Sequence, residues 1–244
     1  MKYSTYLLTI LGTILLYGVY EIARFTYLVN ESRGLIEQSI PYTVSAQGAL
    51  HSLLVLGDST AVGVGTSPDK SVPGRLSETL AVSVENHAQS GARLRDVVSQ
   101  FDSVETEKYE IILIQAGAND AIYGTSDTEI RENISTVLSK AKKLSSDVVF
   151  LTSGDIGEAP LWPALVSNYM TYRTTRVRDI VLSEASKANV VFVDLYASET
   201  PFKENPDVYY ASDYLHLSGE GYGVWADLIV SAMRTQWPEK YGKE

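Results

Sequence analysis

The sequence contains no cysteine and only three histidines among its 244 residues, His51, His87 and His216. The absence of cysteine excludes disulfides, thiol nucleophiles, cysteine-ligated zinc and cysteine-linked lipid anchors. A metal site built on several histidines would need nearly all three, so we expect neither a metal nor a cofactor. The same scarcity means that any histidine that acts as a base is one of these three residues.

Basic residues are also scarce, with 20 Lys and Arg against 30 Asp and Glu and a net charge of −10. Without a basic stripe to neutralise phosphates, nucleic acid and anionic lipid are disfavoured as the main partner. Hydrophobic residues make up 45% of the chain and charged residues 20%, a globular composition. The length suits one α/β domain with an appendage, and it leaves the oligomeric state open.

The amino-terminal stretch 3–20 carries no charge and is rich in leucine and isoleucine. It is just long enough for the roughly 20 apolar residues that a helix needs to cross the hydrocarbon core. Residues 1–29 therefore predict a transmembrane anchor, with a cleaved signal peptide or a helix packed in a soluble protein as alternatives. Lys2 favours a cytoplasmic amino terminus and an extracytoplasmic main domain, anchored or, in the signal-peptide alternative, secreted. Residues 30–48 are expected to be a linker and 49–240 the main domain.

Strands and helices alternate in the main domain. Short apolar runs closed by turn residues predict strands at 53–56, 82–86, 111–114, 148–151 and 190–193. Helical spacing of apolar residues predicts helices at 73–80, 94–101, 130–144, 163–187 and 222–233. Ser218 is the expected N-cap of the last helix. The alternation implies one parallel five-stranded sheet with helices on both faces, an α/β fold.

Ser59 follows the first predicted strand, on the turn Gly57-Asp58-Ser59 that leads into a helix. In open α/β sheets, the chemistry lies at the carboxyl ends of the strands. Alternatively, Asp58 and Ser59 only cap the helix. Three further motifs occupy equivalent loops and can face the same crevice, namely Gly91, Gly117-Ala118-Asn119-Asp120 and Asp213-Tyr214-Leu215-His216.

Acyl transfer explains these residue types. A serine hydroxyl needs a base such as His216 before it can attack a carbonyl carbon. A carboxylate bonded to the other ring nitrogen holds the imidazole in the right tautomer, and Asp213 stands three residues before His216. The developing oxyanion needs donors, which the backbone N–H groups of Ser59 and Gly91 and the side-chain amide of Asn119 can supply.

The other two histidines are poorer candidates for the base. His51 precedes the first strand and belongs to the opposite end of the sheet. His87 has only Glu85 at useful spacing, and we expect the Glu85 side chain not to reach the ring, so His87 is predicted to be structural. Arg93, close behind Gly91, is expected to anchor a loop, with a substrate clamp as the alternative.

With these four blocks, the sequence from about residue 51 to 237 resembles the SGNH hydrolases, also called GDSL esterases and lipases. The resemblance implies a flavodoxin-like three-layer α/β/α sandwich, here preceded by one hydrophobic helix. It implies a serine esterase or lipase with a catalytic triad of Ser59, Asp213 and His216, an oxyanion hole of Ser59, Gly91 and Asn119, and an acyl-enzyme intermediate. Thr60 and Leu217 depart from the family pattern without touching a catalytic group.

Two alternative functions stay open. The anchor suggests an SGNH-type O-acyltransferase or deacetylase that acts on a cell-envelope glycan, because tethering raises the effective concentration at such a substrate. A non-catalytic flavodoxin-like module would instead hold a phosphate at the helix after Gly57. The ester itself can be a small molecule, a lipid or a glycan, and its acyl pocket is expected to be shaped by the loops 63–72, 121–128 and 156–168.

Overall fold

The computed structural model describes residues 2–45, 52–104, 108–198 and 200–242. His51 therefore lies outside the described residues, as do residues 46–48 of the expected linker. Five strands form one sheet in the order β2-β1-β3-β4-β5, and every neighbouring pair is parallel. The strands are β1 (Ser52–Gly57), β2 (Ser83–Asn86), β3 (Ile111–Gln115), β4 (Asp147–Leu151) and β5 (Val191–Val193). The expected parallel sheet is confirmed.

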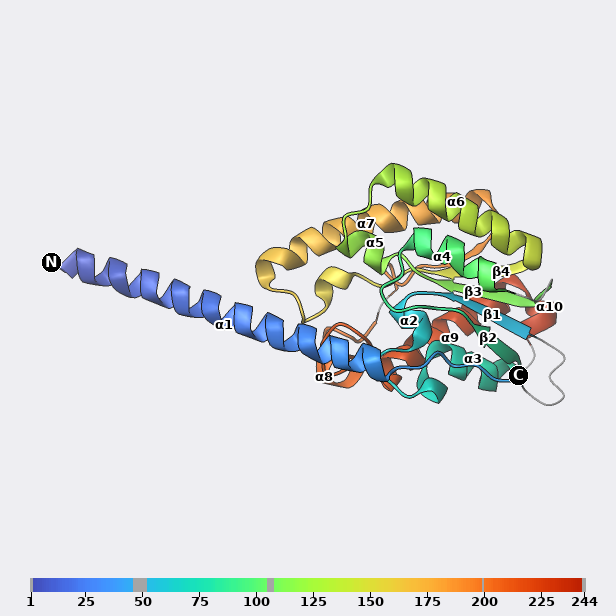
Figure 1. Cartoon of the computed structure of the whole chain (residues 1–244), viewed down its shortest axis with the longest axis horizontal. Coiled ribbons are helices and arrows are strands. Elements are labelled where there is room, and N and C mark those ends of the chain that lie inside the picture. The colour runs from blue at the N-terminus through green and yellow to red at the C-terminus, as the bar shows by residue number, and fades with distance from the viewer. Residues whose placement is uncertain (1, 46–51, 105–107, 199, 243–244) are drawn as a thin grey trace.

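Helices cover both faces of this sheet, which gives three layers (Figure 1). One layer holds α4, α6 and α7, and the other holds α3 and α9. The helices are α1 (Lys2–Gln38), α2 (Ser59–Val62), α3 (Val72–Leu80), α4 (Leu94–Gln100), α5 (Ala118–Ile122), α6 (Asp127–Leu144), α7 (Ala164–Lys187), α8 (Pro206–Tyr209), α9 (Gly219–Gln236) and α10 (Pro238–Tyr241). Ser218 caps α9 as expected, because its hydroxyl oxygen accepts a hydrogen bond from the Gly221 N–H at 3.2 Å.

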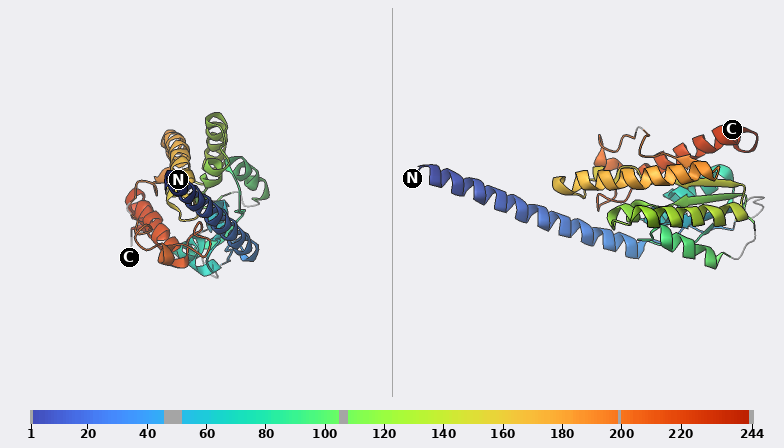
Figure 2. Two further views of the ribbon diagram at one scale, coloured as in Figure 1. Left: turned by 90° about the vertical axis from the view of Figure 1, so that its left-hand side faces the viewer. Right: turned by 90° about the horizontal axis from the view of Figure 1, so that it is seen from above.

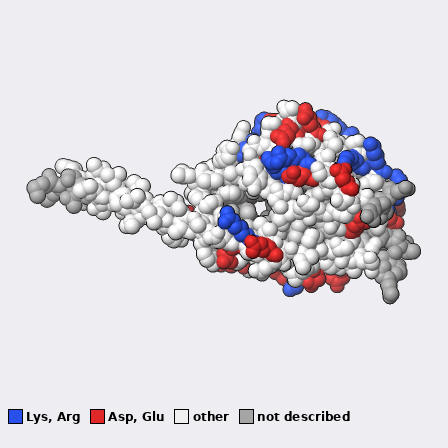
Figure 3. Space-filling model, in the orientation of Figure 1, with Lys and Arg blue, Asp and Glu red and all other residues white. Residues whose placement is uncertain are grey.

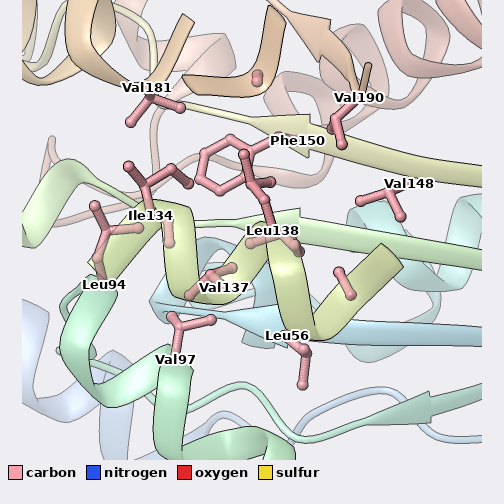
Figure 4. Close-up of a cluster of buried hydrophobic side chains, with 14 of the residues drawn as sticks. Leu56, Leu94, Val97, Ile134, Val137, Leu138, Val148, Phe150, Val181 and Val190 are labelled. Carbon is pink, nitrogen blue, oxygen red and sulfur yellow. The ribbon is translucent and has the colours of Figure 1, made fainter. Parts of the chain in front are cut away.

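The core explains why the strands are continuous apolar runs. Successive side chains of a strand point to opposite faces of the sheet. Leu54 and Leu56 accordingly pack into a cluster with α4, α6 and α7, part of which is drawn in Figure 4. Leu53 and Val55 pack into a second cluster with α3 and α9. Both faces of β1 are buried between Leu53 and Leu56, so every position in this stretch is apolar.

Helix α1 is a single unbroken helix, and its amino-terminal half projects away from the domain (Figures 1 and 2). Its stretch Tyr6–Gln38 is long enough to cross a membrane and contains a window of 18 residues with a mean hydropathy of 1.6. The expected boundary between anchor and linker at residues 29 and 30 falls inside this helix. The division of the chain into anchor, linker and main domain stays a prediction.

Candidate active site

The turn that carries Ser59 is held on both sides by its neighbours. Gly57 ends β1 with φ +148°, and a Cβ atom there would lie 2.0 Å from the backbone oxygen of Gln115, so only glycine fits. The buried Gln100 side chain accepts a hydrogen bond from the Gly57 N–H and donates one to the Gly57 carbonyl, both at 2.8 Å. The Asp58 N–H donates to the Gln115 carbonyl at 2.9 Å. Ser59 therefore starts from a fixed backbone.

Asp58 is the N-cap of α2, and its Oδ1 accepts hydrogen bonds from the N–H and the hydroxyl of Thr60. Burial raises the pKa of Asp58 to about 6, although the bonds from Thr60 oppose the rise. The capping interpretation is thus correct for Asp58. Ser59 is instead the first residue of α2, where the N–H has no acceptor within the helix.

Ser59, His216 and Asp213 form a chain of close contacts. His216 Nε2 lies 2.9 Å from Ser59 Oγ, and His216 Nδ1 lies 2.6 Å from Asp213 Oδ2. The second carboxylate oxygen of Asp213 accepts hydrogen bonds from the N–H groups of Leu215 and His216 at 3.1 and 3.0 Å. Burial alone would raise the pKa of Asp213, but the bonds from His216 and Leu215 outweigh burial and hold this pKa below its ordinary value.

These contacts fix the tautomer of His216. An ionised carboxylate only accepts hydrogen bonds, so the proton of the neutral ring sits on Nδ1, facing Asp213. Nε2 then offers a lone pair to the Ser59 hydroxyl. Asp213 is fully buried and His216 is 6% exposed, so water competes little for either contact.

The loop that carries Asp213 and His216 is closed by its own backbone. Tyr210 and Leu217 form an antiparallel bridge, and the Ala211 N–H donates to the His216 carbonyl at 2.8 Å. The loop presses on Gly65, where a Cβ atom would lie 2.6 Å from the Leu217 carbonyl oxygen. The expectation that residues 63–72 shape the acyl pocket is wrong: among the described residues, none of this segment lines the cavity, because it supports the histidine loop instead.

Gly91 and Asn119 lie on the same cavity as Ser59 and His216. Gly91 has φ +81°, a conformation that favours glycine. The Asn119 amide donates to the Ala92 carbonyl at 3.1 Å, which orients the amide beside the Gly91 loop. Asp120 fixes the same loop through the Leu94 N–H at 2.9 Å, and burial raises the pKa of Asp120 to about 6.

His87 lies elsewhere, and one expectation about it is wrong. Its Nε2 contacts Glu85 Oε1 at 2.6 Å, because side chains two residues apart along extended backbone project to the same side. The other oxygen of Glu85 accepts a hydrogen bond from the Tyr109 hydroxyl at 2.6 Å. Neither His87 nor Glu85 lines the cavity that holds Ser59.

Arg93 stands beside the rim of the cavity. Its backbone N–H donates to Asp96 at 2.9 Å at the start of α4. Its guanidinium lies 5.5 Å from the ring centroid of Tyr123, a residue that lines the cavity. A cation at this distance from an aromatic ring is attracted to it. These contacts favour the expected role of Arg93 as a loop anchor.

The cavity has a volume of about 390 Å³, within the range of about 300–1,000 Å³ that small-molecule pockets occupy. Two of the three expected loops do contribute, with Tyr123 from one and Leu161 and Trp162 from the other.

Sequence reasoning missed the segment 195–210, which has no motif. It also missed helix α1, whose apolar residues carry no sign that some of them face a pocket. Those lining residues are Phe25, Val29, Ser32, Arg33 and Ile36 from α1, and Leu195, Tyr196, Ser198, Thr200, Phe202 and Tyr210 from the later segment.

A parallel five-stranded sheet between two layers of helices, with a serine, a histidine and an aspartate in contact beyond the carboxyl ends of its strands, is the architecture expected of an SGNH hydrolase. Residues 55–224 match the family model of the GDSL-like lipase/acylhydrolase family, and the chain belongs to this family. The resemblance seen in the sequence is thereby confirmed, as is the fold that it implied.

Three similar proteins illustrate the relationship. The GDSL-like esterase Rv1075c of Mycobacterium tuberculosis is 26% identical over 198 residues, which are 77% of this chain and 63% of that protein. An arylesterase of Vibrio mimicus is 32% identical over 119 residues, 44% of this chain and 56% of that protein. The chain thus spans less than two thirds of the length of either relative. The crystal structure of Axe2, an acetylxylan esterase of Geobacillus stearothermophilus, superposes with a TM-score of 0.59 at 20% identity, covering 78% of this chain and 96% of that one.

Proposed function

We propose that this chain is a serine esterase that hydrolyses carboxylic esters through a Ser59–His216–Asp213 triad and an acyl-enzyme. The observation that carries the proposal is the contact of 2.9 Å between His216 Nε2 and Ser59 Oγ, backed by the contact of 2.6 Å to buried Asp213. Membership of the GDSL-like lipase/acylhydrolase family supports the reaction class.

In the first half of the reaction, Ser59 Oγ bonds to the ester carbonyl carbon while its proton passes to His216 Nε2. The carbonyl oxygen becomes an oxyanion, which accepts hydrogen bonds from the N–H groups of Ser59 and Gly91 and from the Asn119 amide. The imidazolium, stabilised by Asp213, then gives its proton to the alkoxy oxygen. The bond between carbon and that oxygen breaks, and the alcohol leaves an acyl group on Ser59.

In the second half, a water molecule attacks the acyl carbon and gives its proton to His216 Nε2. The bond to Ser59 Oγ breaks as Oγ takes this proton back, and the carboxylic acid departs. The two halves use the same base and the same donors, so one preorganised site serves both.

The test compares the full-length wild type with Ser59→Ala on p-nitrophenyl acetate. We expect the variant to lose nearly all turnover and to lose labelling by a serine-directed fluorophosphonate. Ser90→Ala is the matched control, because this serine neighbours Gly91 without lining the cavity. Wild-type turnover in Ser59→Ala, with unfolding unchanged, would overturn the proposal.

The projecting half of α1 supports a second part of the proposal, that the protein is anchored in a membrane. Its large apolar side chains are exposed along the helix, for example Leu8 at 68% and Leu16 at 72%. Such a surface is stable in lipid and costly in water. The glycan O-acyltransferase or deacetylase remains a prediction. The phosphate-binding alternative gives no role to the contact between His216 and Ser59.

A further inference from the structure

One face of helix α1 forms part of the cavity that holds Ser59. Phe25, Val29, Ser32 and Ile36 all line it, at the spacing i, i+4, i+7 and i+11 that defines one side of a helix. These residues precede the region 55–224 that matches the family model. The wall therefore lies outside the part of the chain that matches the family model.

Specific contacts hold this part of α1 against the domain. Arg24 donates a hydrogen bond to the Pro160 carbonyl at 2.8 Å. The Phe25 ring packs on Trp162 with 6.1 Å between centroids, and Trp162 lines the same cavity. Leu28 is only 4% exposed, whereas the large apolar residues nearer the amino terminus are exposed. These contacts hold this part of α1 against the domain, where it forms one side of the cavity.

Helix α1 is also tied to the loop that carries the proposed base. The Ser212 hydroxyl donates to Glu31 Oε2 at 3.1 Å, and Ser212 directly precedes Asp213. The Glu31 contact lies between Val29 and Ile36 along the helix. The wall thus has a fixed position relative to Ser59 and His216.

The residues that line the other sides of the cavity are also mostly apolar. Ile122, Ile156, Leu161 and Phe202 line it together with the α1 residues. An apolar chain that enters the cavity is removed from water. Each methylene buried there contributes about 0.8 kcal/mol, which raises the affinity for the ester about fourfold. The cavity should therefore bind an ester with a long apolar chain more tightly than one with a short chain.

The surroundings of the cavity suit an amphiphile held in a membrane. The wall of α1 continues into its projecting apolar half, which is free of charged side chains in Figure 3. The start of α7 lies at the end of the domain from which α1 projects (Figure 1), and there Leu165 is 95% exposed and Tyr169 52%. Exposed apolar side chains therefore lie on both helices at this end of the domain, while the charged side chains that line the cavity are those of Arg33, Asp155 and Glu158.

From these observations we propose that the face of α1 formed by Phe25, Val29, Ser32 and Ile36 is a substrate-selecting wall of the ester site, and that this site takes esters with a long apolar chain. The inference rests on the proposed esterase function. It assigns the selection of chain length to a helix outside the hydrolase domain. The chain can belong to the acyl or to the alcohol part of the ester, and the test distinguishes the two.

The experiment uses the full-length protein in detergent micelles and the variant Val29→Trp, which fills the cavity from α1. Two substrate series are compared by kcat/KM: p-nitrophenyl esters from acetate to dodecanoate, and acetates of alcohols of the same lengths. We expect Val29→Trp to lower the ratio of long-chain to short-chain kcat/KM at least tenfold in one series. That series identifies the part of the ester that carries the chain.

Two further variants separate selection from general damage. Tyr27→Trp puts the same indole on the opposite, 61% exposed side of α1 and should keep the wild-type ratio. Val29→Ala enlarges the cavity and should move the optimum to a longer chain. Opposite shifts of the optimum in Val29→Trp and Val29→Ala cannot come from loss of folded protein.

The outcomes also separate this inference from the proposed function. Turnover that depends on Ser59, with chain-length profiles that are the same in wild type, Val29→Trp and Val29→Ala in both series, would refute the α1 wall and leave the esterase intact. Absence of any turnover that depends on Ser59, on every ester of both series, would refute the esterase and the wall together.

Discussion

The substitution Asp213→Asn tests the tautomer argument most sharply, because the surrounding backbone dictates how the new amide must sit. Oδ1 of Asp213 accepts two hydrogen bonds, from the N–H groups of Leu215 and His216 at 3.1 and 3.0 Å. An NH2 group cannot accept these bonds, so the amide oxygen of the asparagine takes this position. The NH2 group is then forced to face Nδ1 of His216, at the place where Asp213 Oδ2 now lies at 2.6 Å.

This orientation reverses the tautomer of His216. A donor that faces Nδ1 requires Nδ1 to accept, so the ring proton moves to Nε2. A protonated Nε2 cannot accept the proton of Ser59 Oγ, which lies 2.9 Å away. We expect kcat to fall about 10⁴-fold, as in triads where the same change was made, which equals about 5.4 kcal/mol of transition-state stabilisation.

The assay is steady-state hydrolysis of p-nitrophenyl acetate, with thermal unfolding as the control for folding. Nitrogen-15 NMR of the histidine ring reports directly which ring nitrogen carries the proton, Nδ1 in the wild type and Nε2 in the variant. A folded Asp213→Asn protein that keeps more than a tenth of the wild-type kcat would refute the reasoning. So would an unchanged ring tautomer.

Two further substitutions test the rest of the site. Asn119→Ala removes one oxyanion donor and should lower kcat about 10²- to 10³-fold. An unchanged KM for p-nitrophenyl acetate would show that the lost stabilisation acts in the transition state. An unchanged kcat would contradict the assignment of Asn119 as an oxyanion donor. Gln100→Leu removes the acceptor of the buried Gly57 N–H at 2.8 Å, at a cost of about 1–3 kcal/mol, while the Gly57 carbonyl keeps its hydrogen bond from the Gln89 N–H at 3.0 Å. Urea unfolding measures this loss, and a variant as stable as the wild type would show that Gln100 does not hold the turn.

Most of the fold could be predicted because each element is specified locally. The run Leu53–Leu56 is apolar at every position, and only a strand buried on both faces requires that pattern. The spacing of Ile130, Ile134 and Leu138 placed a helix whose buried face is the one observed in α6. Helix ends shifted by up to three residues, since α6 begins at Asp127, where Ser126 caps it, and not at Ile130.

The site was predictable only where chemistry restricts the residue type. Serine, aspartate and histidine in that order, each after a strand or before a helix, left few other assignments. Gln100 was missed because a glutamine inside an amphipathic helix looks like any solvated residue until the fold buries it against Gly57. The contact between Glu85 and His87 could not be predicted from spacing alone, because the reach of the glutamate side chain depends on its rotamer.

Helix α1 shows why the anchored and the secreted alternatives differ in more than location. The segment expected as an anchor, residues 1–29, contains Phe25 and Val29, and the expected linker contains Ser32 and Ile36, all four on the cavity. Cleavage anywhere between these residues would remove part of the wall and open the cavity to water. Retention of the helix keeps the wall and the projecting apolar half in one continuous helix. An uncleaved α1 therefore predicts an enzyme that prefers long-chain esters at a membrane. A chain cut within this segment would have a wider site and weaker selection among esters, even with Ser59, His216 and Asp213 unchanged.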